Sequence, residues 1–285
     1  MTTHKAFLYS IEGYALPNHK DDFGFVNEAF VKNGIIAEEA FSLPVMDKAF
    51  VVVSGSDMRN KESTVSTELN NISKVVLFIT SDECGDFRVD KIVHPDIKIW
   101  VQSPYPKHEK YFKMPIGAPL MLKNNLPEYT EKTSDMFFAG QITHQRRQQL
   151  ARAIGYLNNV DYVPTAGFMQ GDSPDIYYKK MSKAKIVPAP AGNVTIDSFR
   201  LYEALEMLCL PIADTKDSSG VDFDFWNYTF GEEVPLPKTN NWYFLIDILV
   251  NSIDNYPANM HKAVSWWIKY KRDFSNKIME QINEH

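Results

Sequence analysis

The stretch that decides the fold covers residues 185–213 and reads KIVPAPAGNVTIDSFRLYEALEMLCLPIA. Its first residues form a short apolar run that ends at Pro188, and such a run predicts a buried strand. A loop containing Gly192 follows, and the apolar residues over 197–208 recur at helical spacing. A second short apolar run over 210–213 predicts another strand. A strand, a helix and a strand in this order are typical of a parallel α/β unit.

The same alternation of strand and helix signals extends through most of the chain. Short apolar runs, some of them rich in β-branched residues, predict strands over 6–10, 48–54, 75–80, 97–102, 135–139, 161–164 and 185–188. Helical spacing and capping residues predict helices over 22–33, 63–73, 143–157 and 172–183, and one or two more over 257–285. Strands that alternate with helices predict parallel sheets and place the chain in the α/β class.

A proline-rich stretch separates these signals into two halves. Residues 104–131 contain five prolines and little periodicity, which is typical of a connection between domains. We therefore expect a Rossmann-like domain over 1–125, a second α/β domain over 126–260, and a helical tail over 261–285 that crosses back to pack on the first domain. Ligands of open α/β sheets bind at the carboxyl ends of the strands, so we expect the site in a central cleft between the domains.

Composition excludes several classes of protein. No apolar run approaches the roughly 18 residues that span a bilayer. The first apolar run is too short for a secretory signal, so we expect no integral membrane segment and a cytoplasmic location. The two cysteines, Cys84 and Cys209, lie far apart and do not indicate a disulfide framework. The net charge of −6 removes the simple electrostatic case for nucleic-acid binding.

The helix predicted over 197–208 carries the most informative side chains. Asp197 or Ser198 can cap it, and the free N–H groups of a helix start suit a phosphate. Arg200 lies in the first turn, where a guanidinium can reach a diphosphate. Glu203 lies one turn further on the same side, where a carboxylate can accept hydrogen bonds from both ribose hydroxyls. The alternative interpretation is an ordinary ion pair between Arg200 and Glu203 on a helix surface.

The pattern SFRLYEAL over 198–205, with Leu-Pro-Ile over 210–212, resembles the donor-binding helix of GT-B glycosyltransferases. It is most similar to the exostosin-like group, in which the Arg and the Glu contact the diphosphate and the ribose of a nucleotide sugar. The resemblance implies these two roles for Arg200 and Glu203. It also implies that three neighbouring residues line the donor pocket: Gly192, Ser198 and Phe199.

A second similarity lies in MFFAGQITHQRR over 136–147. A strand that ends in Ala-Gly, followed by a basic helix start, resembles the opening of the exostosin C-terminal domain. Gly140 lets the backbone approach a ligand closely. By the same resemblance Arg146 or Arg147 neutralises the leaving diphosphate, with His144 beside it. A fixed cation can replace a metal at this step, so we expect neither a required metal nor a tightly bound cofactor.

Carboxylates that follow the strand predicted over 75–80 are the candidates for a general base. Asp82 and Glu83 come directly after this strand, where a carboxylate can take the proton of an acceptor hydroxyl. The alternative is an ordinary loop carboxylate or helix cap. Glu12 and Gly13, in the loop after the first strand, are candidates for contacts with the acceptor.

The combined expectation is a GT-B glycosyltransferase that moves a sugar from a nucleotide-diphosphate donor to a glycan hydroxyl. The expected donor is a UDP-sugar, and the expected source is a bacterium or a phage-infected cell. The residues RLYE over 200–203, with Asp82 after its strand, also resemble phage DNA β-glucosyltransferases. DNA that carries hydroxymethylated bases is therefore the alternative acceptor. Two further alternatives are a nucleotide- or sugar-binding module without turnover, and a phosphorylase or epimerase on the same fold.

Overall fold

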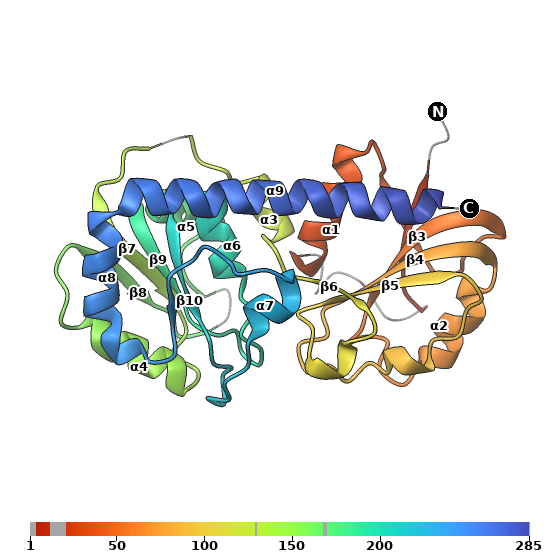
Figure 1. Ribbon diagram of the computed structural model, residues 1–285, viewed down its shortest axis with the longest axis horizontal. Coiled ribbons are helices and arrows are strands. Elements are labelled where there is room, and N and C mark those ends of the chain that lie inside the picture. The colour runs from red at the N-terminus through yellow and green to blue at the C-terminus, as the bar shows by residue number, and fades with distance from the viewer. Residues whose placement is uncertain (1–3, 12–20, 129, 168–169, 285) are drawn as a thin grey trace. The chain divides into compact units, whose positions relative to one another are not determined.

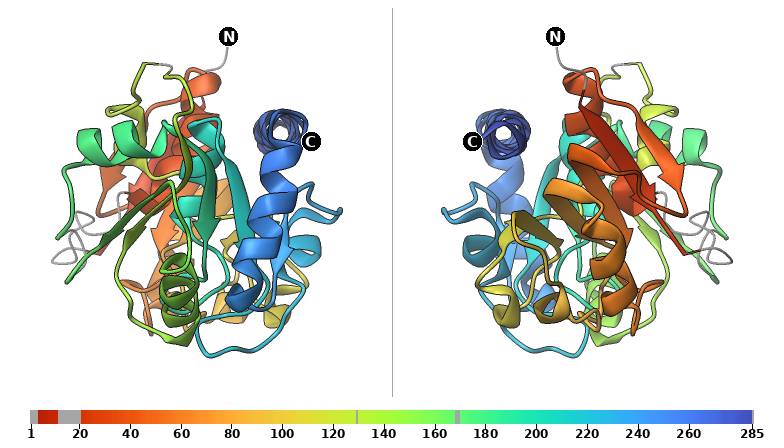
Figure 2. Two further views of the ribbon diagram at one scale, coloured as in Figure 1. Left: turned by 90° about the vertical axis from the view of Figure 1, so that its left-hand side faces the viewer. Right: turned by 90° about the vertical axis from the view of Figure 1, so that its right-hand side faces the viewer.

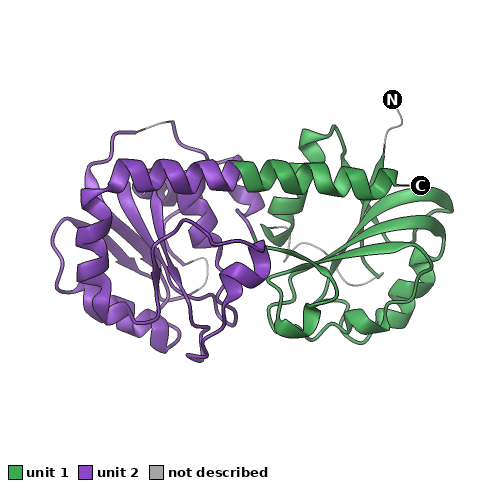
Figure 3. Cartoon of the chain, viewed as in Figure 1, with its two compact units in different colours: residues 1–116, 269–285 green, residues 117–268 purple. Residues whose placement is uncertain are grey.

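The computed structural model describes residues 4–11, 21–128, 130–167 and 170–284. The chain forms two compact units (Figure 3). Unit 1 consists of Met1–Ile116 and Lys269–His285, and unit 2 of Gly117–Ile268. Each unit contains a sheet flanked by helices (Figure 1), and every strand pair in both sheets is parallel. The predicted α/β class with parallel strands is confirmed.

Unit 1 contains a six-stranded sheet with the order β2-β1-β3-β4-β5-β6. Its strands are β1 (Lys5–Tyr9), β2 (Ala37–Ala40), β3 (Met46–Ser54), β4 (Ile72–Thr80), β5 (Ile97–Gln102) and β6 (Phe112–Met114). Its helices are η2 (Asp21–Phe23), α1 (Gly24–Lys32), α2 (Glu62–Leu69), η3 (Val89–Lys91), η4 (Pro106–His108) and the last part of α9 (Tyr256–Asn283).

Successive side chains of these strands point to opposite faces of the sheet, and both faces are covered. On one face, Phe30 of α1 packs on Phe50 and Phe78. On the same face, Phe274 of α9 packs on Phe78 and Trp100. The opposite face packs against α2 through aliphatic side chains: Val51, Val53, Val65, Leu69, Leu77 and Ile79.

Unit 2 contains a five-stranded sheet with the order β11-β10-β9-β7-β8. Its strands are β7 (Ser134–Gly140), β8 (Val160–Pro164), β9 (Ala184–Ala189), β10 (Leu210–Asp214) and β11 (Lys238–Thr239). Its helices are α3 (Leu120–Lys123), α4 (Gln145–Ile154), α5 (Pro174–Met181), α6 (Phe199–Glu206), α7 (Phe225–Phe230), η5 (Trp242–Phe244), α8 (Leu245–Asp254) and the first part of α9.

The helices of unit 2 also cover both faces of their sheet. Tyr178 and Met181 of α5, with Ala204 and Met207 at α6, pack against Phe137 and its neighbours on β7 and β9. On the other side, α8 contacts α4 and β9. The left view of Figure 2 shows α5 and α8 on opposite sides of the sheet. This arrangement leaves the edge formed by the carboxyl ends of the strands to the connecting loops.

Three strands were not expected from the sequence: β2, β6 and β11. The first part of the stretch 104–131 is not a connection, because β6 lies within it and pairs with β5 from Trp100 to Gln102. Strand β2 reads AEEA and lies at the sheet edge, with both glutamates exposed. An edge strand of this kind has no apolar run by which to find it.

Helix α9 is one helix of 28 residues that contributes to both units. In unit 2, Trp267 packs on Tyr202 with ring centroids 5.0 Å apart and donates a 2.7 Å hydrogen bond to Glu206. In unit 1, Gln281 accepts a 2.8 Å hydrogen bond from Trp100 Nε1. Among the helices of the described ranges, α9 included, none is long and apolar enough to cross a membrane.

Candidate functional site

The strand order of unit 2 creates a point at which the connections diverge. From β7 the chain passes through α4 to β8 on one side, whereas from β9 it passes through α6 to β10 on the other. Since β7 and β9 are neighbours, their following loops turn away from each other and leave space at their carboxyl ends. Ligands of open parallel sheets bind at such switch points. The residues that the sequence singled out between 140 and 203 belong to these two connections.

The two central strands also separate as they approach this edge. Their register contains only two pairs, Ser134 with Ala184 and Met136 with Ile186. Prolines at 188 and 190 lack the N–H groups that would extend the pairing. The carbonyl of Ala139 near the end of β7 instead accepts a 2.6 Å hydrogen bond from Arg200 Nη2. A side chain of α6 thus replaces a backbone donor at the gap.

Arg200 is fixed by two contacts, but one of its hydrogen-bond donors has no partner among the described residues. Its guanidinium lies 4.7 Å from the ring centroid of Phe138, in addition to its bond to Ala139. Its Nε atom is buried and has no hydrogen-bond partner among the described residues. A Cβ on Gly140, whose φ is +154°, would lie 2.7 Å from Arg200 Nη2. A side chain at position 140 would therefore displace the Arg200 guanidinium, a reason for glycine here that sequence reasoning did not supply.

Glu203 is buried and oriented by two tyrosines from α5. Tyr177 and Tyr178 each donate a 2.9 Å hydrogen bond, one to Oε2 and the other to Oε1. Burial, and after it the Glu203 carboxylate, raise the pKa of Tyr177 far above its usual range. Arg200, one turn before Glu203 on the same helix, donates to the Ala139 carbonyl, so these two side chains of α6 are held by different partners. A carboxylate oxygen can accept more than one hydrogen bond.

Arg147 and His144 lie at the start of α4, beside the loop that follows β9. Arg147 is 9% exposed and donates hydrogen bonds of 3.3 Å to the carbonyls of Ala191 and Gln141. His144 is the N-cap residue of α4, and both of its ring nitrogens are buried without a partner in the described part of the chain. Burial, followed by the charge of Arg147, lowers the pKa of His144. The imidazole is therefore neutral near pH 7.

Arg146 occupies a different environment from Arg147. Its Nη2 and Nε bind Asp214 in an ion pair whose shortest N–O distance is 2.5 Å, and both side chains are buried. Asp214, at the end of β10, also accepts from Trp242 Nε1 at 2.8 Å and from the Ala191 N–H at 3.3 Å. Sequence reasoning missed Asp214, although a carboxylate directly after an apolar run was the signal used for Asp82.

The loop between β9 and α6 is tight, and the residue at the start of α6 provides no side-chain cap. A Cβ on Gly192 would lie 2.6 Å from the carbonyl oxygen of Asp197. Ser198 is the N-cap by position, but its side chain makes no capping hydrogen bond. Asp197 accepts a 2.6 Å hydrogen bond from Tyr202, and Phe199 is the first residue of the helix. The first N–H groups of α6 therefore lack a side-chain cap and suit an anion.

In unit 1, Asp82 follows β4 as expected and holds a loop in place. Its Oδ1 accepts from the Asp86 N–H at 2.9 Å and its Oδ2 from the Phe87 N–H at 3.1 Å. Burial raises the pKa of Asp82, against the opposing effect of these two hydrogen bonds. Glu83 is half-buried, and its backbone carbonyl accepts from the Tyr105 hydroxyl. The acceptor-side candidates at positions 12 and 13, Glu12 and Gly13, lie outside the described residues.

Two sequence comparisons were without a match. No protein-family model matches this chain, and no curated protein is significantly similar to it in sequence. Within the ranges that the structure describes, no three His, Cys, Asp or Glu side chains come together as metal ligands. Function is therefore inferred from the residues of the site and their geometry.

Proposed function

We propose that the protein is a glycosyltransferase of the GT-B type whose nucleoside-diphosphate-sugar donor binds to unit 2 at the ends of β7 and β9. The observation that carries this proposal is the state of Arg200. Its guanidinium is fixed where the central strands separate, and its buried Nε has no partner among the described residues. A buried donor without an acceptor costs about 1–3 kcal/mol, which a bound anion recovers.

The diphosphate is the part of the donor that this end of the sheet suits best. Two kinds of hydrogen-bond donor belong to α6. The N–H groups at its start receive no side-chain cap from Ser198, and the buried Nε of Arg200 has no partner among the described residues. Arg147 adds a second guanidinium, and the neutral His144 adds a ring nitrogen that can donate. Charge-assisted hydrogen bonds from arginine to phosphate are the strong ones. Arg147 also stabilises the charge that develops on the leaving diphosphate.

We assign binding of the ribose to Glu203, because its carboxylate is buried and held in a fixed orientation. Its two oxygens are oriented by Tyr177 and Tyr178, and a carboxylate oxygen can accept more than one hydrogen bond. A pair of ribose hydroxyls can donate to these positions. We expect a UDP-sugar as donor, on the resemblance of the helix to those of the exostosin-like group.

We assign the role of general base, which takes the proton of the acceptor hydroxyl, to Asp82, with Glu83 as the second candidate. A raised pKa brings a carboxylate closer to the range in which it accepts a proton near neutral pH. A glycan is preferred to DNA as acceptor because basic residues of α9 are neutralised locally. Lys271 lies 3.0 Å from Glu28, and Lys269 lies 2.7 Å from Asp273.

A nucleotide panel tests the donor site directly. The melting temperatures of the wild type and Glu203→Ala are measured with UDP, GDP, ADP and CMP, since a ligand that binds only the native state raises the melting temperature. We expect UDP to stabilise the wild type and to lose this effect in the variant. Arg152→Gln, which changes an exposed arginine of α4, serves as the control and keeps the shift. A wild type that responds to none of the four nucleotides contradicts the proposal.

A further inference from the structure

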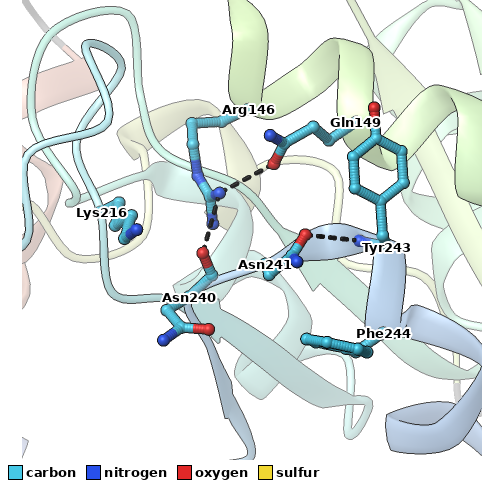
Figure 4. A pocket seen from close by; sticks show the side chains of 7 residues that line it. All are labelled: Arg146, Gln149, Lys216, Asn240, Asn241, Tyr243 and Phe244. Atoms are coloured by element: carbon cyan, nitrogen blue, oxygen red, sulfur yellow. Dashed lines mark hydrogen bonds between the residues drawn. The ribbon is translucent and has the colours of Figure 1, made fainter.

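A pocket with a volume of about 400 Å³ lies in unit 2, away from Arg200 and Glu203 (Figure 4). Its walls come from α4, from the segment after β10 and from the segment between β11 and α8. Asp214 separates it from the candidate donor site, because this carboxylate binds Arg146 of the pocket on one side and the Ala191 N–H on the other. Its size falls within the usual range for small-molecule sites.

The amide side chains of the pocket present donors to it. Arg146 Nη1 donates to Gln149 Oε1 at 2.9 Å and to the Asn240 carbonyl at 3.1 Å. The Tyr243 N–H donates to Asn241 Oδ1 at 3.1 Å. These bonds fix the amide orientations and occupy the acceptors. The NH₂ groups of Gln149 and Asn241 have no partner among the described residues and remain free to donate.

Lys216 gives the pocket a positive charge. It lies two residues beyond β10, and no described carboxylate pairs with its ammonium group. The nearby carboxylate of Asp214 is already bound by Arg146 and by Trp242 Nε1. A pocket with amide donors and an ammonium group selects a ligand whose polar atoms are acceptors, above all an anion.

Two aromatic rings complete the lining. Tyr243 is 50% exposed and Phe244 is 56% exposed, and they follow each other at the junction of η5 and α8. Large aromatic side chains that remain exposed beside polar groups are characteristic of ligand-binding surfaces. Aromatic faces offer apolar area to the C–H groups of a ring, while the adjacent donors bind its oxygens.

We propose that this pocket binds an anionic saccharide, a sugar ring that carries a phosphate or a carboxylate group. Lys216 binds the anionic group, Gln149 and Asn241 donate to ring substituents, and Phe244 packs against the ring. The inference is independent of the proposed transferase activity, because neither Arg200 nor Glu203 lines this pocket.

Calorimetric titration with four probes tests the proposal: glucose 1-phosphate, glucuronic acid, glucose and inorganic phosphate. We expect glucose 1-phosphate and glucuronic acid to bind. Glucose lacks the anionic group and inorganic phosphate lacks the sugar ring, so each should bind at least about tenfold more weakly than glucose 1-phosphate. The two charged sugars also distinguish a phosphate from a carboxylate as the anionic group. Inorganic phosphate that binds as tightly as glucose 1-phosphate overturns the proposal, and so does the failure of both charged sugars to bind.

Single variants locate the binding in this pocket. Lys216→Gln and Phe244→Ala are each expected to weaken binding about tenfold. Lys216 has no ion pair among the described residues, and Phe244 is 56% exposed. Lys183→Gln removes the same charge next to the amino end of β9, at the opposite edge of the sheet, and is expected to change nothing. Unchanged affinity in both pocket variants, with melting temperatures like that of the wild type, overturns the assignment. Arg200→Gln weakens only UDP binding, which separates this inference from the proposed function.

Discussion

A β-carbon on Gly140 would lie 2.7 Å from Nη2 of Arg200, closer than real contacts allow. The glycine at the end of β7 and the arginine in the first turn of α6 therefore define one another's positions. The bond from Arg200 to the Ala139 carbonyl depends on this closeness.

Gly140→Ala is accordingly predicted to displace Arg200. We expect the affinity for UDP to fall at least about tenfold, because the diphosphate loses its fixed guanidinium. Gly155→Ala is the matched control, since Gly155 ends α4 in a helical conformation and an added Cβ meets its nearest neighbour only at 3.4 Å. Calorimetry of both variants checks this, and equal affinities would remove the link between Gly140 and donor binding.

Glu203→Gln is predicted to act on the ribose alone. Gln keeps one acceptor oxygen for the tyrosines but presents an NH₂ group where the second carboxylate oxygen stood. We expect the wild type to bind UDP about tenfold more tightly than 2′-deoxy-UDP, and the variant to lose most of this preference. A variant that discriminates between the two nucleotides as well as the wild type does would place the ribose elsewhere.

Asp82→Asn distinguishes a transferase from a binding module. We expect turnover of a UDP-sugar to fall about a hundredfold or more, as general-base catalysis contributes on this scale, while stabilisation by UDP persists. Because burial raises the pKa of Asp82, the acid limb of the wild-type rate profile should lie above the ordinary pKa of an aspartate. Glu83→Gln is run in parallel, and a large loss in it alone would transfer the role of base to Glu83.

Unit 1 is predicted to lose stability in mild acid through His108. Burial lowers its pKa to about 4, and its Nδ1 accepts a 3.1 Å hydrogen bond from the Tyr105 N–H. In the unfolded chain the imidazole takes up a proton near its ordinary pKa of 6.5, so the stability that neutral His108 supports is present above pH 6.5 and is lost as the pH falls towards 4.

The expected loss is about 2–3 kcal/mol over this interval. His108→Asn, which retains an acceptor but does not titrate, should show a flatter dependence of the unfolding free energy on pH. Denaturant unfolding at pH 7, 5.5 and 4.5 provides the comparison. Parallel curves for the two proteins would show that His108 does not carry the effect.

Chelation tests whether the arginines suffice for catalysis. If Arg147 and Arg200 stabilise the leaving diphosphate, turnover of a UDP-sugar should continue after dialysis against EDTA. An activity that disappears with EDTA and returns with a divalent cation would contradict this part of the account.

The sequence predicted the sheets better than the site. Buried parallel strands such as β3 and β4 are nearly continuous apolar runs, and these can be recognised without a structure. Strand β6 has only three residues among prolines, so its pairing with β5 decides its conformation. Short strands of this kind depend on tertiary contacts, which a local pattern does not contain.

In the site, the sequence predicted which residue types follow the strands but not what they bind. Tyr177 and Tyr178 lie about 25 positions before Glu203, on another helix, and no local spacing connects them. Arg146 and Arg147 are equivalent in the sequence, yet adjacent helical residues point in different directions. One reaches Asp214, 68 positions away, and the other the loop after β9.

The central claim is that Arg200 binds the diphosphate of a nucleotide sugar, and titration of UDP into the wild type, Arg200→Gln and Arg152→Gln tests it most directly. Both variants lose one positive charge, and Arg152 lies on the exposed side of α4. The account predicts that Arg200→Gln binds UDP at least about tenfold more weakly than the wild type while Arg152→Gln binds it equally well. Equal binding by all three proteins, or no binding by the wild type, would contradict it.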